Sequence, residues 1–181
     1  MNIDHWAMPI TDLGGKLLGV EIKSHVHREG VRHLAGMERE VVAEQLRVIE
    51  SKRGWFLDNA LFCMTTSEEA THHDLAFMRY MTTKKQEHEH QWLDDLGVHD
   101  GTAIPLVTSE YRAVRLNKRY VEENISRPIF PVLIKSIRQY CDKVIIPVLD
   151  KSNYRMLREA GVWAVQGEYK PIRFEQCEKL L

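Results

Sequence analysis

The sequence lacks an excess of charge of one sign, a long apolar run and a cysteine framework. Lysine and arginine total 25 and aspartate and glutamate total 26, so the formal net charge is −1. This balance gives no electrostatic case for nonspecific binding to DNA or RNA. No apolar run approaches the roughly 18 residues that suggest a transmembrane helix. Hydrophobic residues are 44% and charged residues 28%, as in ordinary globular proteins.

The three cysteines, Cys63, Cys141 and Cys177, are scattered and form no CxxC pair. They predict reduced thiols in a cytoplasmic protein. The N-terminus, MNIDHWAMPITD, has neither a basic nor an apolar region of the kind that opens a signal peptide, so none is expected. The length of 181 residues predicts one domain, 1–181.

Residues 93–121 carry the most informative pattern. Asp94 and Asp95 follow an apolar pair and precede Gly97, which predicts a buried strand running into a turn. Neighbouring side chains on a strand point to opposite faces, so two adjacent carboxylates act together best where the strand ends. Residues 113–117 predict a second strand. A strand, a helical crossover and another strand make a parallel βαβ unit.

Turn residues and periodicity predict the other elements of an α/β chain. We expect strands at 6–10 and 16–26 joined as a hairpin, a polar loop at 27–36, a helix at 37–52 ended by Gly54, a strand at 57–64, a helix from Ser67 that continues through 75–81, a helix at 127–143 with Pro128 near its first turn, a strand at 144–150, a helix at 152–160 ended by Gly161, a strand at 163–165 and a helix at 172–181.

These motifs resemble the EAL domain, the cyclic di-GMP phosphodiesterase family. Asp94-Asp95-Leu96-Gly97 stands where the family has a DDFG-type motif, Glu21-Ile22-Lys23 stands at the signature triplet, and residues 157–161, 166–167 and 174–181 resemble the end of the family's domain. The resemblance implies a TIM-barrel-like (β/α) fold. Asp94 follows Met64 by only 30 positions, and the chain is shorter than the roughly 200 residues of a complete barrel. We therefore expect a truncated fold that lacks at least one βα unit.

The same resemblance implies that the catalytic and metal-binding set is eroded. Glu21, Asp94 and Asp95 are the remnant positions, where the family's carboxylates are kept. At the lost positions, Met64 stands in place of a metal-binding asparagine, Arg115 in place of a catalytic lysine, Asn117 in place of an aspartate and Pro147 in place of a glutamate. His25 stands in place of an arginine that binds the dinucleotide. A thioether is a poor ligand for a hard cation, and arginine does not replace a catalytic lysine easily. We expect no catalytic residue, no metal and no cofactor.

Each of these features has an alternative interpretation. The three remnant carboxylates either form local hydrogen bonds, which we favour, or hold one Mg²⁺ weakly. His72, His73, His88 and His90 indicate a solvated surface more than a zinc site. Arg115, Lys118 and Arg119 indicate a solvated strand exit more than an anion site. Trp92 and Trp163 are expected in the core.

The opening segment resembles one group within the family most. Residues 8–12 and 17–22, MPITD and LLGVEI, are similar to the opening of degenerate, stand-alone EAL proteins that act as anti-FlhDC factors. This implies a non-enzymatic regulator that binds the FlhD subunit of the flagellar activator FlhDC and represses flagellar genes and motility, without direct contact with nucleic acid, membrane or cyclic di-GMP. The alternatives are a cyclic di-GMP receptor that does not hydrolyse its ligand, or a weak residual phosphodiesterase.

Overall fold

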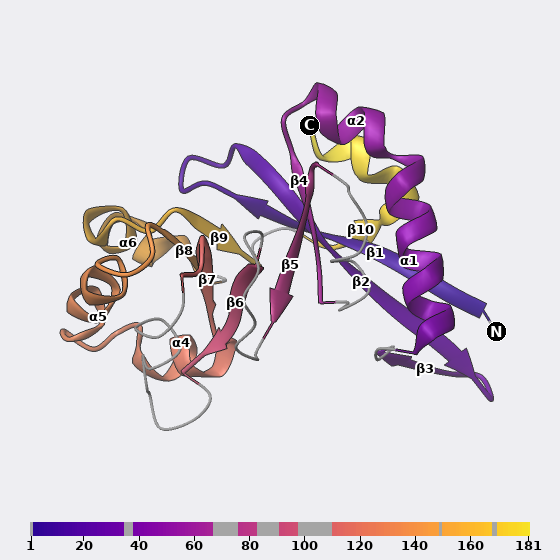
Figure 1. Cartoon of the computed structure of the whole chain (residues 1–181). Helices are drawn as coiled ribbons and strands as arrows, with labels where there is room; N and C mark the ends of the chain where they lie inside the picture. Colours follow the sequence, from indigo (N-terminus) through magenta and orange to yellow (C-terminus); the bar gives the residue numbers. More distant parts are fainter. Residues whose placement is uncertain are drawn as a thin grey trace. The chain divides into compact units, whose positions relative to one another are not determined.

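The computed structural model describes residues 2–34, 38–66, 76–82, 91–97, 110–148, 150–167 and 170–181. The chain divides into two compact units. The first unit comprises Met1–Ile10, Leu17–Tyr80 and Tyr169–Leu181, and the second comprises Thr11–Lys16 and Met81–Glu168. Each unit packs helices against strands, so the α/β class expected from the sequence is confirmed (Figure 1). No helix in the described ranges is long and apolar enough to cross a membrane.

The first unit is built on the long hairpin of β1 (Asn2–Thr11) and β2 (Leu17–Arg28). The hairpin was predicted, and so was its turn: the Asp12 side chain accepts the N–H groups of Gly14 and Lys16 at 2.8 and 2.9 Å. The other strands of this unit pair alongside: β10 (Ile172–Arg173) runs antiparallel to β1, β3 (Val31–Leu34) antiparallel to β2, β4 (Phe62–Thr65) parallel to β2, and β5 (Met78–Thr82) parallel to β4.

Helix α1 (Arg39–Ser51) carries the apolar stripe that the sequence predicted, and it buries Val41, Val42, Leu46, Val48 and Ile49. It packs in the same core as α2 (Arg53–Asp58) and the 3₁₀ helix η3 (Phe174–Leu180), where Phe56 stacks on Phe77 at 5.0 Å. Cys63 and Cys177 lie in this core. Burial raises the pKa of Cys63 well above its ordinary range and that of Cys177 to about 11. Both thiols are free, as expected.

The second unit contains four parallel strands with their helices. The strands are β6 (Gln91–Leu96), β7 (Ala113–Leu116), β8 (Lys143–Pro147) and β9 (Ala164–Gln166), paired in that order; the helices are α4 (Lys118–Asn124), α5 (Phe130–Ile137), α6 (Tyr154–Ala160) and the 3₁₀ turn η2 (Lys151–Asn153). Val114, Ile134, Ile146 and Leu157 form the centre of its core. Trp92 is buried and its ring meets Trp163 edge to face at 5.8 Å, which confirms the core expectation for Trp92.

Several expected elements differ. Of the helix expected to continue through 75–81, the described residues 76–81 are not helical, because 78–82 form β5; pairing with β4 outweighs the local helical pattern. The expected polar loop at 27–36 contains the end of β2 and strand β3. The helix expected at 127–143 is shorter and begins at Phe130 with Pro131 in its first turn. Gly54 lies inside α2, and residues 172–181 form β10 and η3 in place of one α-helix.

The truncation falls around β5. Twelve residues separate β4 from β5, and eight separate β5 from β6. A helical crossover between parallel strands takes about a dozen residues or more. The interval between Met64 and Asp94 is therefore too short for the full set of βα units. Ser67, His72, His73, His88, His90 and the crossover at 98–109 lie outside the described residues.

Candidate functional site

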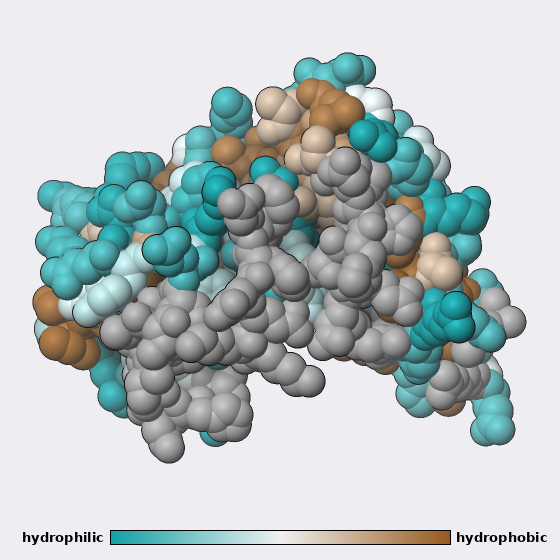
Figure 2. Space-filling model, viewed as in Figure 1, coloured by the Kyte–Doolittle hydropathy of each residue, from teal (hydrophilic) through white to brown (hydrophobic). Residues whose placement is uncertain are grey.

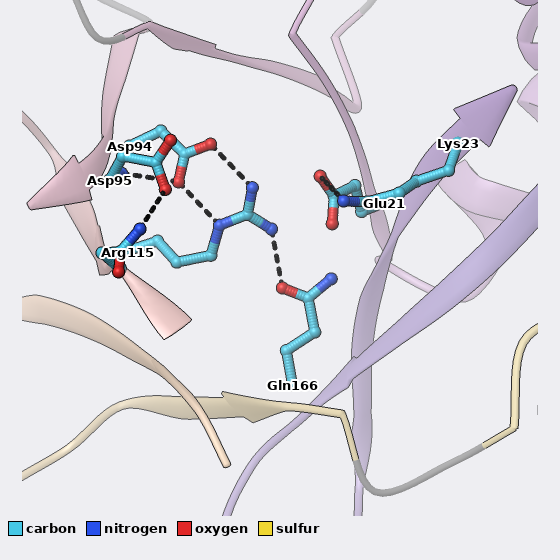
Figure 3. A network of polar contacts seen from close by, with 7 residues as sticks. Glu21, Lys23, Asp94, Asp95, Arg115 and Gln166 are labelled. Carbon is cyan, nitrogen blue, oxygen red and sulfur yellow. Dashed lines mark hydrogen bonds and ion pairs between the residues drawn. The ribbon is translucent and has the colours of Figure 1, made fainter. Parts of the chain in front are cut away.

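In the first unit, the retained glutamate lies in a row of residues across three parallel strands. Glu21 of β2 pairs in register with Met64 of β4, which pairs in turn with Arg79 of β5. Glu21 is 3% exposed, and the Lys23 ammonium lies 3.6 Å from its carboxylate (Figure 3). This row therefore presents one carboxylate, one thioether and one guanidinium.

The neighbours of Glu21 in this row are unsuited to a hard cation. Met64 is fully buried, so its thioether is part of the core. Arg79 donates hydrogen bonds to the carbonyl oxygens of Ala76 and Met78 at 3.2 and 2.9 Å. Strand β5 (Met78–Thr82), which pairs with β4, contains no carboxylate.

In the second unit, the paired aspartates lie at an irregularity of β6. The register between β6 and β7 shifts between Leu93 and Leu96, and Asp95 has a φ of +55°. Aspartate tolerates this left-handed conformation better than most residues. The bulge buries Asp94 and exposes Asp95, whose N–H donates to Asp94 Oδ1 at 2.8 Å. The strand end therefore turns at the aspartate pair, as predicted.

Arg115 of β7 holds Asp94 through two hydrogen bonds. Its Nε donates to Asp94 Oδ1 at 2.8 Å, and its Nη2 donates to Oδ2 at 2.7 Å. Its Nη1 donates to Gln166 Oε1 at the end of β9 at 2.7 Å. Figure 3 shows the guanidinium lying between these two side chains. Both members of the ion pair are about 10% exposed, so the pair is shielded from water and salt.

The prediction of a solvated strand exit is wrong for Arg115, since this side chain is buried. Adjacent parallel strands place Arg115 beside a buried carboxylate, and a buried carboxylate requires a partner. The prediction is confirmed for Lys118 and Arg119. These exposed side chains of α4 pair with Glu122 and Glu123 one turn along the helix.

Asn117, at the position of a family aspartate, has a structural role. It is the N-cap of α4, where its Oδ1 accepts the N–H of Tyr120 at 3.0 Å. Its Nδ2 donates to Asp95 Oδ1 at 3.3 Å. Asp95 and Asp94 thus both form local hydrogen bonds, which is the interpretation that the sequence analysis favoured for them.

These residues do not fit a divalent metal centre. The two oxygens of Asp94 accept from a guanidinium, and Pro147, at the end of β8, has no side-chain ligand atom. Within the described ranges, no three His, Cys, Asp or Glu residues are placed to hold a metal ion. Two-metal phosphodiester hydrolysis needs a cluster of oxygen ligands around both ions, which the described side chains at these strand ends do not supply.

The fold defined by these units and this strand-end site is that of the EAL domain. No family model and no curated protein matches the sequence. Among solved structures, the EAL-like domain protein YdiV is similar over 99% of this chain and 96% of its own, with a TM-score of 0.76 and 18% identity. An EAL domain protein from Listeria monocytogenes EGD-e gives a TM-score of 0.70 at 16% identity over 98% of this chain and 91% of its own. The Xanthomonas citri FimX EAL domain, crystallised in complex with c-diGMP, gives a TM-score of 0.61 at 14% identity over 94% of this chain and 88% of its own.

These comparisons confirm a truncated, TIM-barrel-like EAL fold. Sequence reasoning did not identify Gln166 as a partner of Arg115, although Gln166-Gly167 had been matched to the end of the EAL pattern. It also missed Arg79, because β5 was interpreted as a helix. In both cases the missing information was which strands are neighbours.

Proposed function

We propose that this protein is a non-enzymatic regulator that binds the FlhD subunit of the flagellar activator FlhDC and thereby represses flagellar gene expression and motility. The observation that carries this proposal is the bidentate ion pair between Arg115 and Asp94. It occupies a carboxylate that a phosphodiesterase of this fold would need for its metal. The chain retains the fold, while charged side chains at its strand ends bind one another inside the protein.

The choice of partner is supported by two further facts. The opening segment, MPITD and LLGVEI, resembles that of the anti-FlhDC factors. YdiV has a similar fold over nearly the whole of both chains. A fold by itself does not define a function, so FlhD is a proposal about the partner that a binding experiment must decide.

The direct experiment is size-exclusion chromatography of the purified protein with FlhD and with FlhDC, at micromolar concentration. We expect co-elution with both, in the presence or absence of cyclic di-GMP and Mg²⁺. Absence of co-elution would contradict the choice of partner. A complex that forms only with the dinucleotide would favour a cyclic di-GMP receptor.

A steric or conformational block is the mechanism we propose, since the chain carries no charge excess suited to nucleic acid. The protein would act on FlhDC without touching DNA or a membrane and without a cofactor. An electrophoretic mobility assay with a flagellar promoter distinguishes a block of FlhDC from direct binding of this protein to the promoter. We expect no shift by this protein alone and a loss of the FlhDC shift when it is added.

A further inference from the structure

A series of side-chain hydrogen bonds joins four elements of the first unit. His5 Nδ1 of β1 lies 2.8 Å from Ser24 Oγ of β2. Gln45 Nε2 of α1 donates to the same Ser24 Oγ at 2.7 Å, and Thr65 Oγ1 of β4 donates to Gln45 Oε1 at 3.3 Å. His5, Ser24 and Thr65 are each 2% exposed. We call these four residues the His5 network.

The donors and acceptors of the His5 network define its direction. A serine hydroxyl donates one hydrogen and accepts at two lone pairs. Of the two described partners of Ser24 Oγ, the Gln45 amide nitrogen is a donor, so the hydroxyl hydrogen is directed to His5 Nδ1. His5 is therefore the neutral tautomer that carries its hydrogen on Nε2. This Nε2 is buried and has no hydrogen-bond partner among the described residues, so the ring acts on its surroundings through Ser24.

Protonation of His5 is incompatible with this direction. A proton from solvent binds the lone pair of Nδ1, after which both ring nitrogens are donors. Ser24 then has to accept where it donated before, and its own hydrogen needs a new acceptor. A half turn of the Gln45 amide supplies one, because it exchanges the amide oxygen and nitrogen. Gln45 Oε1 then accepts from Ser24, and Gln45 Nε2 donates to Thr65 Oγ1.

The charges around His5 determine when this happens. Burial is the largest effect and lowers the pKa of His5, and Arg47 of α1 lowers it further. Three carboxylates raise the pKa of His5: Glu175 of η3, Glu44 of α1 and Asp4 of β1. Because burial outweighs these carboxylates, the ring is neutral at about pH 7 and takes up its proton below about pH 6.5, the ordinary histidine pKa.

Gln45 lies at the border of the buried side of α1. Val42, Leu46 and Ile49 are buried, whereas Gln45 is partly exposed. Figure 2 shows hydrophilic residues at the surface where Figure 1 places α1. An amide at this border can turn without displacing packed apolar side chains. The His5 network therefore leads from a buried ring to the edge of the core.

We propose that the His5 network is a pH-sensitive relay, in which protonation of His5 reverses its three hydrogen bonds and so changes the contacts of α1 and of the end of β4. Thr65 is the last residue of β4 and directly follows Met64, at a strand end where the EAL resemblance places a metal ligand. Mild acidification thus reaches this strand end through side chains of the first unit. The relay does not involve FlhD, so it can be tested separately from the proposed function.

The test is nuclear magnetic resonance of the full chain, with labelled histidine and glutamine side chains, between about pH 7.5 and pH 5.5, on both sides of the ordinary histidine pKa. At the higher pH we expect the His5 ring to carry its hydrogen on Nε2. As His5 takes up its proton, the nuclear Overhauser contacts of the Gln45 amide hydrogens should move from Ser24 to Thr65, with the midpoint of the His5 titration. A charge that acts only through space would shift signals without moving these contacts.

Ser24→Ala should leave the titration of His5 in place and remove the accompanying response of Gln45 and Thr65. Ser136→Ala is the matched control, because Ser136 is an exposed serine on α5 of the second unit, and it should keep the response. If Ser24→Ala does not fold, Gln45→Leu interrupts the network at a partly exposed position and should remove the response of Thr65.

Four results would overturn the relay. The first is a His5 ring that carries its hydrogen on Nδ1 at the higher pH. The second is a Gln45 amide that keeps its contacts with Ser24 after His5 is protonated. The third is a response of Thr65 that persists in Ser24→Ala or Gln45→Leu. The fourth is unfolding of the protein before His5 titrates, since the relay then never operates in the folded state.

Discussion

Arg115 and Asp94 form a buried, two-point ion pair across β6 and β7. The lysine at this position of an active EAL enzyme, by resemblance, would have a single flexible ammonium. A guanidinium instead matches both oxygens of a carboxylate in one plane. The pair turns a position associated with catalysis into a link between strands, and Gln166 extends this link to β9.

Asp94→Ala should destabilise the protein strongly. Removing one partner of a buried ion pair leaves an uncompensated charge, which costs about 3–5 kcal/mol. We expect this loss in the free energy of unfolding measured with urea. The control is Asp95→Asn, since the Asp95 side chain is exposed and makes a 3.3 Å contact with Asn117, and asparagine tolerates the φ of +55° at this position; its effect should be within about 1 kcal/mol.

A double-mutant cycle with Asp94→Leu and Arg115→Met then isolates the coupling between the two side chains. The double variant should recover part of the stability that either single variant loses. Additive effects in the cycle, or a neutral Asp94→Ala, would show that the pair does not hold the strands together.

Arg115→Lys should not create phosphodiesterase activity. The substitution restores the residue type that the EAL resemblance implies, but Met64 and Pro147 still supply no oxygen ligand. We expect no linear dinucleotide from cyclic di-GMP with Mg²⁺ or Mn²⁺, for the wild type or the variant. Metal-dependent product that disappears in Asp95→Ala would contradict this prediction and indicate a residual enzyme.

Stability should fall as the pH drops below about 6.5, the ordinary pKa of histidine. Burial lowers the pKa of His5 in the folded protein. The unfolded chain therefore takes up a proton at a higher pH than the folded chain does, which favours unfolding as the pH falls. His5 Nδ1 lies 2.8 Å from Ser24 Oγ, and no hydrogen-bond partner is described for its buried Nε2.

The measurement is the melting temperature at several values between about pH 7 and pH 5.5, around the ordinary histidine pKa. His5→Gln should reduce the decline on acidification. His33→Gln, at an exposed position of β3, should retain it. Equal declines in wild type and His5→Gln would exclude His5 as the group responsible.

Gly97→Ala should destabilise the protein, whereas Gly54→Ala should not. Gly97 has a φ of +103°, and an added Cβ would lie 2.7 Å from the Tyr120 ring. The strained backbone alone costs about 1 kcal/mol or more. Gly54 lies in α2 with open space around it, so alanine there should stabilise by about 0.5–1 kcal/mol. Equal effects on urea unfolding would contradict the assignment of Gly97 to a crowded turn.

The parts of the fold that the sequence predicted are those with strong local signals. The hairpin of β1 and β2, the stripe of α1 and the strands β6 to β9 followed from turn residues and apolar periodicity. Strand β5 was missed because its five residues acquire their conformation from pairing with β4. Strand β3 was missed because its four residues, Val31–Leu34, show no alternation of apolar and polar side chains.

The site was predictable in its residues and not in its contacts. Glu21, Asp94 and Asp95 and the replaced positions could be named from their motifs. The burial of Arg115 could not be predicted, because this burial depends on which strands lie next to β7 in the sheet. The use of Asn117 as a helix cap follows from its place directly before α4, and an N-cap signal of this kind is visible in a sequence.

We propose that this EAL fold acts by binding a protein and not by cleaving a dinucleotide. Calorimetric titration of FlhD into the wild-type protein tests it most directly, with and without saturating cyclic di-GMP and Mg²⁺. We expect a Kd in the micromolar range or tighter that the dinucleotide and metal leave unchanged. No heat of binding to FlhD, together with saturable binding of cyclic di-GMP alone, would contradict it.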